Sequence, residues 1–359
     1  MKSAVRPSSL GWPVRPFDRW PAVIFGALAL WAFAPLTVTL LFVAQHGGVF
    51  TGVNGGDLFD QFQYLAWTRD AGSHLLASNL WAIGHTPHDY LQPMYLISGL
   101  VWWLGASIQV AYLVWKPVAV LVLFLGAGAY VRDHLGARRG PVVAALALAL
   151  FYESPVYALA TWTGHLTSGH RLALILASDD ADSALQLWGV EHTAIAIGLA
   201  PVFLIAAERV LAARAAEDWR SPRRWTAVAA ISGLLVSWLY PWLGVTLLGI
   251  VGGLIVCRGP RRRYLSLAAP VVATALPLIY GVVLSRSDAS WRAFQAHLIA
   301  TGTAPWWALL ASFCPLVALA VMGLRRPRSD RDWMLILWPI ASAAIYFLVP
   351  QSPPTPSPA

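Results

Sequence analysis

The chain has 359 residues, of which 58% are hydrophobic and only 12% are charged. This composition excludes an ordinary soluble domain, and apolar stretches long enough to cross about 30 Å of hydrocarbon recur along the sequence. The formal net charge is +8, but the basic residues form short clusters between apolar stretches, which argues against nucleic-acid binding and for a membrane protein. Cys257 and Cys314 lie in or beside apolar stretches, so no disulfide framework is expected.

The first apolar stretch runs from about Pro21 to Ala44 and follows several basic residues. We expect it to be an uncleaved membrane anchor, with the N-terminus in the cytoplasm, because it is too long for a signal peptide and has no clear cleavage site. Residues 46–93 then form a first external loop. An interfacial helix is expected at Tyr95–Leu104, before the second span within Gln109–Val131.

The rest of the chain continues this alternation of apolar stretches and loops. Residues 225–257 are too long for one helix, and Tyr240-Pro241-Trp242 predicts two short helices that meet at an external turn. The predicted fold is therefore all-α, polytopic and plasma-membrane embedded, with about nine transmembrane helices over residues 1–349. The remaining spans are predicted at 141–159, 193–213, 265–284, 306–324 and 333–349, with external loops at 160–190 and 285–303 and a disordered Pro/Ser-rich tail at 350–359.

The charges support this topology. It places twenty of the 25 Lys and Arg residues inside, and Lys116 within the second span. Only four basic residues fall outside, and they are Arg69, Arg171, Arg286 and Arg292. All but one of the 9 histidines and ten of the 17 acids fall outside or at external span ends, so any chemistry is expected to face outward.

The most informative motif begins at Gly55-Gly56-Asp57 and continues to Asp70. The spacing predicts a short amphipathic helix on the outer surface. Asp57, Asp60, Tyr64, Trp67 and Ala71 share one helical face, expected to line a cavity, and Leu58, Phe62 and Leu65 share the other. The alternative interpretation is structural, because Asp57 suits an N-cap and Asp60 suits the first turn of a helix.

The stretch from Asp60 to Asp70 resembles the first external loop of the GT-C membrane glycosyltransferases, which include protein O-mannosyltransferases and lipid A aminoarabinose transferases. Their loop carries Asp-Glu-x-(Arg or His)-Tyr, followed by a short helix often ending in Ala-Arg-Glu. Here Asp60, Tyr64 and Arg69 match, whereas Gln61 and Gln63 depart from the pattern. The resemblance implies a polyprenyl-phosphate sugar donor, and a role for Asp60 as the base or the carboxylate that positions the acceptor.

Other candidate residues lie near the predicted outer surface. Glu153 is a further catalytic candidate, because a carboxylate at membrane depth needs a partner. Glu191 and His192 open the fourth span at the depth expected for a site at the membrane surface, which makes them candidate substrate contacts; the alternative is structural, because an acid there suits the helix dipole. Three external arginines, Arg171, Arg286 and Arg292, could hold a donor phosphate or extend toward lipid headgroups. Lys116, which precedes Pro117, could face the bundle interior or pair with an acid.

A divalent cation is the one cofactor that the sequence leaves open. His85, His88 and Asp89 could form a metal site with Asp60, although a solvated polar loop is the commoner outcome. The run Asp179-Asp180-Ala181-Asp182 lacks the spacing of an EF-hand, and either a solvated loop or a cap for a helix beginning near Ser183 is the better interpretation.

The favoured function is transfer of a sugar from a polyprenyl-phosphate carrier to an acceptor at the outer face of the membrane. Asp60 and Asp57 lead the catalytic candidates, with Tyr64 and Trp67 beside them on the helix as substrate contacts. A transporter for a polar solute is the alternative, supported by Lys116 and the break at Pro241. A non-catalytic membrane protein is a third interpretation.

Overall fold

The computed structural model describes residues 19–56, 58–82, 84–136, 138–163, 182–215, 221–260, 262–300, 306–323, 327 and 329–348. Three expectations lie wholly outside these residues, namely those for Asp57, for Arg171 and for the tail 350–359. Most of the loop expected at 160–190 also lies outside them.

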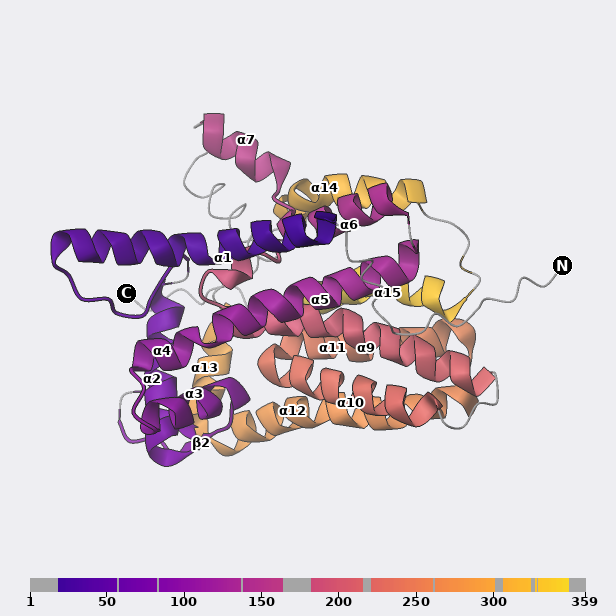
Figure 1. Cartoon of the computed structure of the whole chain (residues 1–359). Helices are drawn as coiled ribbons and strands as arrows, with labels where there is room; N and C mark the ends of the chain where they lie inside the picture. The colour runs from indigo at the N-terminus through magenta and orange to yellow at the C-terminus, as the bar shows by residue number, and fades with distance from the viewer. Residues whose placement is uncertain are drawn as a thin grey trace.

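The described chain is almost entirely helical (Figure 1). Its one sheet is a two-stranded antiparallel hairpin of β1 (Ala77–Ser78) and β2 (His88–Tyr90). Two short 3₁₀ helices, η1 (Leu185–Leu187) and η2 (Arg262–Leu267), lead into longer helices. The α-helices are α1 (Arg19–His46), α2 (Leu58–His74), α3 (Pro93–Trp103), α4 (Ile108–Leu113), α5 (Trp115–Leu135), α6 (Arg139–Phe151), α7 (Pro155–Thr163), α9 (Glu191–Ala215), α10 (Ser221–Leu239), α11 (Pro241–Arg258), α12 (Ala268–Ser287), α13 (Ala289–Ala300), α14 (Trp306–Gly323) and α15 (Asp330–Leu348).

Within the described residues, 6 helical stretches are long and apolar enough to cross a membrane, which is the pattern of a multi-pass membrane protein. They are Arg19–His46, Ile108–Leu135, Glu191–Ala213, Pro241–Arg258, Arg262–Ser287 and Trp306–Gly323. Each corresponds to one of the nine predicted spans. The expected helices α10 and α15 also form, but each opens with charged residues, which leaves a shorter apolar stretch for crossing.

The span expected at 141–159 is wrong. Helix α6 ends at Phe151, the backbone of Tyr152 is extended, and a new helix begins at Pro155. Pro155 explains the break, because a proline disfavours the α conformation at the residue before it and has no N–H to continue the ladder. The two pieces are each too short to cross a bilayer.

Proline also accounts for two other helix boundaries. The predicted turn at Tyr240-Pro241 is confirmed, since α10 ends at Leu239 and α11 begins at Pro241. In the second span, α4 ends at Leu113 and α5 begins at Trp115. Pro117 cannot donate a hydrogen bond to the carbonyl of Leu113, so the helix is interrupted one turn before the proline.

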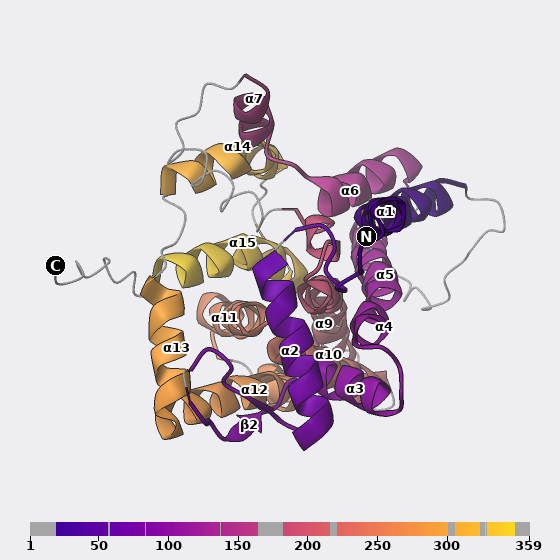
Figure 2. The ribbon, with the colours of Figure 1, turned by 90° about the vertical axis from the view of Figure 1, so that its left-hand side faces the viewer.

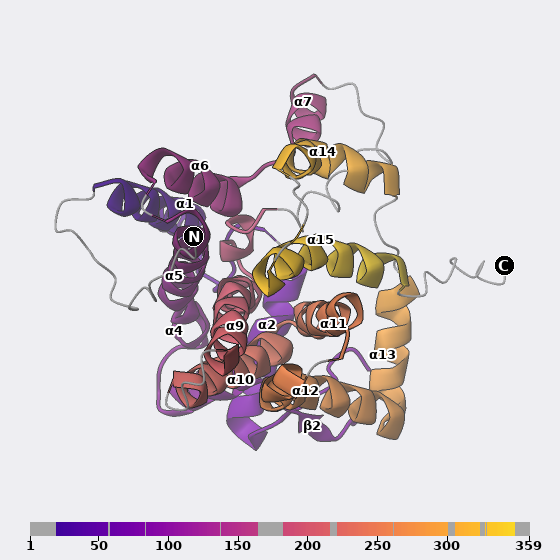
Figure 3. The same ribbon diagram turned by 90° about the vertical axis from the view of Figure 1, so that its right-hand side faces the viewer.

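The long helices run roughly side by side, and a smaller layer lies across one end of the bundle. Figure 1 shows α1, α5, α9, α10 and α12 along a common direction, with α2, α3, α13 and the hairpin at the left. Figure 2, viewed from that end, shows α2 crossing the ends of α9 and α10. Figure 3 shows the opposite end, with α6, α7 and α14 to one side of the central helices. We call the layer of α2, α3, α13 and the hairpin the end layer.

Two crossings bring helix backbones into close contact through glycines. Where α5 passes α9, a Cβ atom built on Gly198 would lie 2.6 Å from the carbonyl oxygen of Val122, and one on Gly126 would overlap Gly198 itself. Where α2 passes α3, a Cβ on Gly72 would lie 2.6 Å from the carbonyl oxygen of Gly99. Small residues permit this close packing, which is typical of membrane helices.

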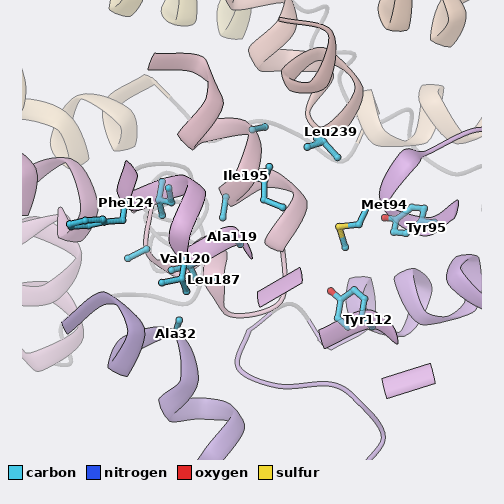
Figure 4. Close-up of a cluster of buried hydrophobic side chains, with 14 of the residues drawn as sticks. Ala32, Met94, Tyr95, Tyr112, Ala119, Val120, Phe124, Leu187, Ile195 and Leu239 are labelled. Carbon is cyan, nitrogen blue, oxygen red and sulfur yellow. The ribbon is translucent and has the colours of Figure 1, made fainter. Parts of the chain in front are cut away.

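Buried apolar side chains join the end layer to the bundle. Figure 4 shows Met94 and Tyr95 of α3 near Tyr112 of α4, and Leu187 of η1 beside Val120 of α5. This continuous packing fixes the positions of α2, α3 and the start of α9 relative to one another.

The opposite end of the bundle is held by ion pairs. Asp133 at the end of α5 binds Arg209 of α9 at 2.5 Å and also binds Arg331 of α15. The Nε atom of Arg331 lies 3.1 Å from Oε2 of Glu208. These pairs connect α5, α9 and α15 at the end of the bundle opposite the end layer.

Candidate functional site

The first turn of α2 is held by a side chain to which the sequence assigned no role. Gln61 is fully buried, accepts a hydrogen bond from the backbone N–H of Asn54 at 3.0 Å and donates back to its carbonyl at 3.0 Å. The same Nε2 atom also contacts the carbonyls of Gly56 and Trp188. Gln61 therefore fastens α2 to the chain before it and to the segment that enters α9.

The burial of α2 corrects the predicted pair of faces. Leu65 is buried together with Trp67 and Ala71, although Leu65 was expected on the opposite face. Leu58 and Phe62 are exposed by 51% and 52%, and Phe59 by 87%. These apolar side chains line no protein core. An interfacial helix presents such residues to the lipid boundary, so their exposure agrees with the expected surface location.

Four aromatic side chains converge beneath the first two turns of α2, and we call them the aromatic floor. Tyr64 of α2 lies edge-on to His192 of α9, with ring centroids 5.0 Å apart. It also packs against Tyr95 of α3 at 5.8 Å and Tyr112 of α4 at 6.4 Å. Tyr95 and Tyr112 are buried, whereas Tyr64 is half-buried. Residues of four helices, α2, α3, α4 and α9, therefore meet at one point.

Asp60 lies exposed on α2, one helical turn before Tyr64. The pKa of Tyr95 lies well above its usual value, chiefly because the side chain is buried. The charges of neighbours, which include Tyr64 and Asp60, raise it further, so Asp60 is close enough to act on the floor. Tyr95 consequently remains a neutral hydroxyl, a hydrogen-bonding group rather than a base. A solvent-facing carboxylate beside neutral hydroxyls can orient a polar ligand or accept a proton.

The segment that enters α9 is tied down by the buried Lys116. Its Nζ atom lies 3.2 Å from Oε1 of Glu191, and both side chains are 0% exposed. The ammonium also donates to the carbonyl of Ala32 in α1 at 3.3 Å and to that of Leu187 in η1. The expectation that Lys116 pairs with an acid is confirmed. The pair fixes Glu191, and thereby the neighbouring His192, at the edge of the floor.

Several buried polar atoms around this point make no hydrogen bond within the described part of the chain. They include Nδ1 of His192, Nε2 of Gln63 and both terminal atoms of the Asn54 side chain. Buried polar groups normally have partners, so unsatisfied ones call for a water molecule or a polar ligand. The site therefore combines an exposed carboxylate, an aromatic floor and unsatisfied polar atoms.

Trp67 lies next to this group but is fully engaged in packing. It is 6% exposed, its indole donates to the carbonyl of Ser78 at 3.0 Å, and its rings contact Tyr95 and Trp291. Trp67 therefore packs α2 against the hairpin and α13, and it is not an exposed substrate contact as the sequence predicted.

Glu153 lies in the break between α6 and α7 with much of its surface exposed. The part of its carboxyl group that is shielded from solvent raises its pKa. Its charge acts on Asp182, whose pKa is raised to about 6 chiefly by burial. Asp182 accepts hydrogen bonds from the N–H groups of Ala184 and Leu185, at 2.9 and 3.2 Å, just before η1. Asp182 therefore binds the backbone at the start of η1, whereas Ala184 occupies the N-cap position itself. Asp179 and Asp180 lie outside the described residues.

Arg286 and Arg292 lie where α12 meets α13. Both side chains are exposed, and Arg292 donates to the carbonyl oxygens of Ser285 and Arg286, at 3.3 and 2.6 Å. Figure 2 shows the α12–α13 corner in the same end layer as α2. The two arginines therefore belong to the same end of the molecule as Asp60.

The hairpin places its histidines differently from the expected metal site. His88 lies with Asp70 and His74 of α2, and these three form the one potential metal-binding group found among the described residues. His85 is exposed and outside that group, and the Asp89 carboxylate accepts a hydrogen bond from the indole of Trp291 at 3.0 Å. Asp60 also lies outside the group.

Comparisons with protein-family models, with curated proteins and with solved structures find no match for this chain.

Proposed function

We propose that this chain transfers a sugar from a polyprenyl-phosphate carrier to an acceptor at the outer surface of the plasma membrane. The observation that carries the proposal is the position of Asp60. Its side chain is exposed on α2, one helical turn before Tyr64 of the aromatic floor, and its charge acts on Tyr95 and Tyr112. The resemblance of Asp60–Asp70 to the first loop of GT-C glycosyltransferases supports the same assignment.

The reaction is a single displacement at the anomeric carbon. The acceptor hydroxyl oxygen attacks that carbon, the bond from the carbon to the phosphate oxygen breaks, and the phosphate leaves on its lipid. Asp60 orients the acceptor hydroxyl and takes its proton, which is the task of a general base. One displacement inverts the configuration of the sugar.

The residues beneath Asp60 suit a sugar. The C–H faces of a sugar ring pack on aromatic side chains, and its hydroxyls need hydrogen-bond partners. The floor supplies the rings, and the unsatisfied atoms of Gln63 and His192 supply polar groups. Arg286 and Arg292 are the described candidates for holding the donor phosphate, since guanidinium groups bind phosphate in a bidentate manner. Arg171 is retained as a third candidate from the sequence.

A lipid-linked donor requires the site to meet the membrane. Leu58, Phe59 and Phe62 expose an apolar edge of α2, and α2 runs across the direction of the long helices. A helix that lies in the membrane interface has this orientation. With the N-terminus in the cytoplasm, the end layer lies on the extracytoplasmic side.

The test uses the full chain in proteoliposomes with a panel of radiolabelled polyprenyl-phosphate sugars and measures loss of the label from the lipid. Asp60→Asn keeps the side-chain size but removes the base, and should lower turnover by a factor of about 10² or more. Asp288→Asn is the matched control, because Asp288 precedes α13 and accepts from the N–H of Ser290, a role that Asn fills about as well. Parent-like turnover in Asp60→Asn, or an equal loss in both variants, would contradict the assignment.

One observation favours a second function, a permease for a polar solute. Lys116 and Glu191 form a fully buried ion pair within candidate spans, and ionisable groups inside a membrane often mark a transport path. The same proteoliposomes distinguish the two proposals. Solute exchange by the parent chain that Asp60→Asn leaves intact, without any sugar transfer, would favour the permease.

A further inference from the structure

We propose that Asp70, His74 and His88 bind a divalent transition-metal ion, preferentially Zn²⁺, which ties the end of α2 to the hairpin. The Oδ1 atom of Asp70 lies 3.1 Å from Nδ1 of His74, and its Oδ2 atom lies 3.3 Å from Nδ1 of His88. One ligand atom from each residue lies within 4.8 Å of the other two. Two imidazoles and one carboxylate are a ligand set that zinc uses.

The separations suit a metal ion. Zinc binds nitrogen and oxygen ligands at about 2.0–2.2 Å, so two ligands in a tetrahedral site lie about 3.4 Å apart. The two nitrogen–oxygen distances, 3.1 and 3.3 Å, are close to this value. Each imidazole nitrogen therefore already lies at a ligand-to-ligand distance from one of the two carboxylate oxygens of Asp70.

The local fold explains why the three residues meet. Asp70 and His74 are separated by four positions on α2, so they share one face of the helix. The hairpin pairs Ser78 with His88, which returns His88 to the end of the same helix. The rings of His74 and His88 then stack with centroids 3.7 Å apart. Neutral imidazoles tolerate such stacking, and the neutral ring is the form that binds a metal.

Two hydrogen bonds from Ser78 orient the carboxylate of Asp70. The backbone N–H and the hydroxyl of Ser78 donate to Oδ2 of Asp70 at 2.6 and 2.7 Å. The carbonyl of Ser78 in turn accepts from the buried indole of Trp67 at 3.0 Å. Oδ2 is therefore anchored, while Oδ1 faces His74. Partners of this kind fix the first ligands of a metal site.

The proposed metal site is distinct from the proposed glycosyltransferase site. Asp70 follows Asp60 by ten residues on α2, which corresponds to about 15 Å along a helix. With three protein ligands, the ion would keep one position open to water, and the exposed edges of His74 and His88 give it access. Its main effect would be to fasten the hairpin to α2.

The test uses the purified full chain in detergent, treated with a chelator and then titrated with Co²⁺, whose visible absorption reports tetrahedral coordination, and with Zn²⁺ in competition. The parent should bind one equivalent. Asp70→Asn and His88→Gln should each weaken binding by more than about 100-fold, since even residues that only support metal ligands contribute 10–100-fold. His85→Gln is the matched control, because His85 is exposed on the same hairpin loop and lies outside the group.

If His88→Gln folds poorly, a second variant in which cysteine replaces His88 still tests the proposal. His88→Cys supplies another good zinc ligand and should retain tight binding, with the added charge-transfer band of a cobalt–thiolate bond. Zn²⁺ should also raise the unfolding temperature of the parent and of His85→Gln, but not that of Asp70→Asn. The proposal is overturned if the parent shows no tetrahedral Co²⁺ spectrum, or if His85→Gln weakens binding as much as His88→Gln.

Discussion

Lys116 Nζ lies 3.2 Å from Glu191 Oε1, and neither side chain reaches the surface. The pair joins α5 to the start of α9, and the ammonium adds contacts to the carbonyls of Ala32 and Leu187. Removing one partner of a buried ion pair leaves an unpaired charge in a medium of low dielectric, and the cost of that charge exceeds the value of the pair itself.

We therefore expect Lys116→Met to destabilise the protein by about 3–5 kcal/mol, and Glu191→Gln to be destabilising as well. The double variant should lose clearly less than the sum of the two single losses, because it leaves neither charge unpaired. Thermal unfolding in detergent would measure all three. Strictly additive losses would show that the two residues act independently.

We expect substitution of Gln61 to destabilise the chain locally, at the start of α2. Gln61→Ala removes the partners of the Asn54 N–H and carbonyl, and an unsatisfied buried group costs about 1–3 kcal/mol. Gln63→Ala is the control on the same helix, because its Nε2 has no partner among the described residues. Hydrogen exchange at Asn54 should accelerate in the first variant and stay unchanged in the second. Equal exchange in both variants would contradict the anchoring role.

The raised pKa of Asp182 predicts how its contribution to stability changes with pH. Its folded-state pKa of about 6 lies above the ordinary value of 3.8, so the folded state holds the proton more tightly and stability falls as the pH rises from about 4 to 6. At pH 8 the penalty is about 3 kcal/mol, at 1.36 kcal/mol per pKa unit. Asp182→Asn still accepts from Ala184 and Leu185. It should therefore match the parent at pH 4 and unfold at a higher temperature at pH 8; an equal difference at both values would refute the assignment.

The expected orientation can be checked by labelling single cysteines in a variant that lacks Cys257 and Cys314. Ser73 is exposed at the end of α2, and Ser329 is exposed before α15 at the opposite end of the bundle. In intact cells, a membrane-impermeant reagent should label Ser73→Cys and leave Ser329→Cys unlabelled until the membrane is opened. The reverse pattern would move the end layer to the cytoplasmic side.

Local sequence patterns predicted the helices better than they predicted the site. The helix after Asp57, the proline turn at Tyr240-Pro241 and six apolar spans depend on neighbours along the chain, and the structure contains them all. The span expected over 141–159 failed because hydrophobicity alone does not register the effect of Pro155 on the residue before it.

The faces of α2 show a second limit. Apolar periodicity marks a non-aqueous neighbour, but it cannot tell a protein core from lipid. Leu65 turned out to face the core, whereas Leu58 and Phe62 do not.

Contacts between segments that are distant in the sequence could not be predicted, for a different reason. Gln61 reaches the carbonyl of Trp188, and His88 reaches Asp70 only through the register of the hairpin. No spacing in the sequence encodes those distances. Lys116 was a partial exception, because a lone lysine in an apolar span requires a counter-charge, although the sequence did not say which acid supplies it.

Because of the glycine contact between α5 and α9, the position of the first turns of α9 depends on packing at the centre of the bundle. Gly198 lies seven residues after Glu191, or about 10 Å further along α9. A side chain at either Gly126 or Gly198 would separate the two helix backbones and so tilt the end of α9 that carries His192. The shape of the aromatic floor thus depends on two residues that touch no part of it, so a substitution at Gly126 or Gly198 can move His192 while every residue of the floor stays unchanged.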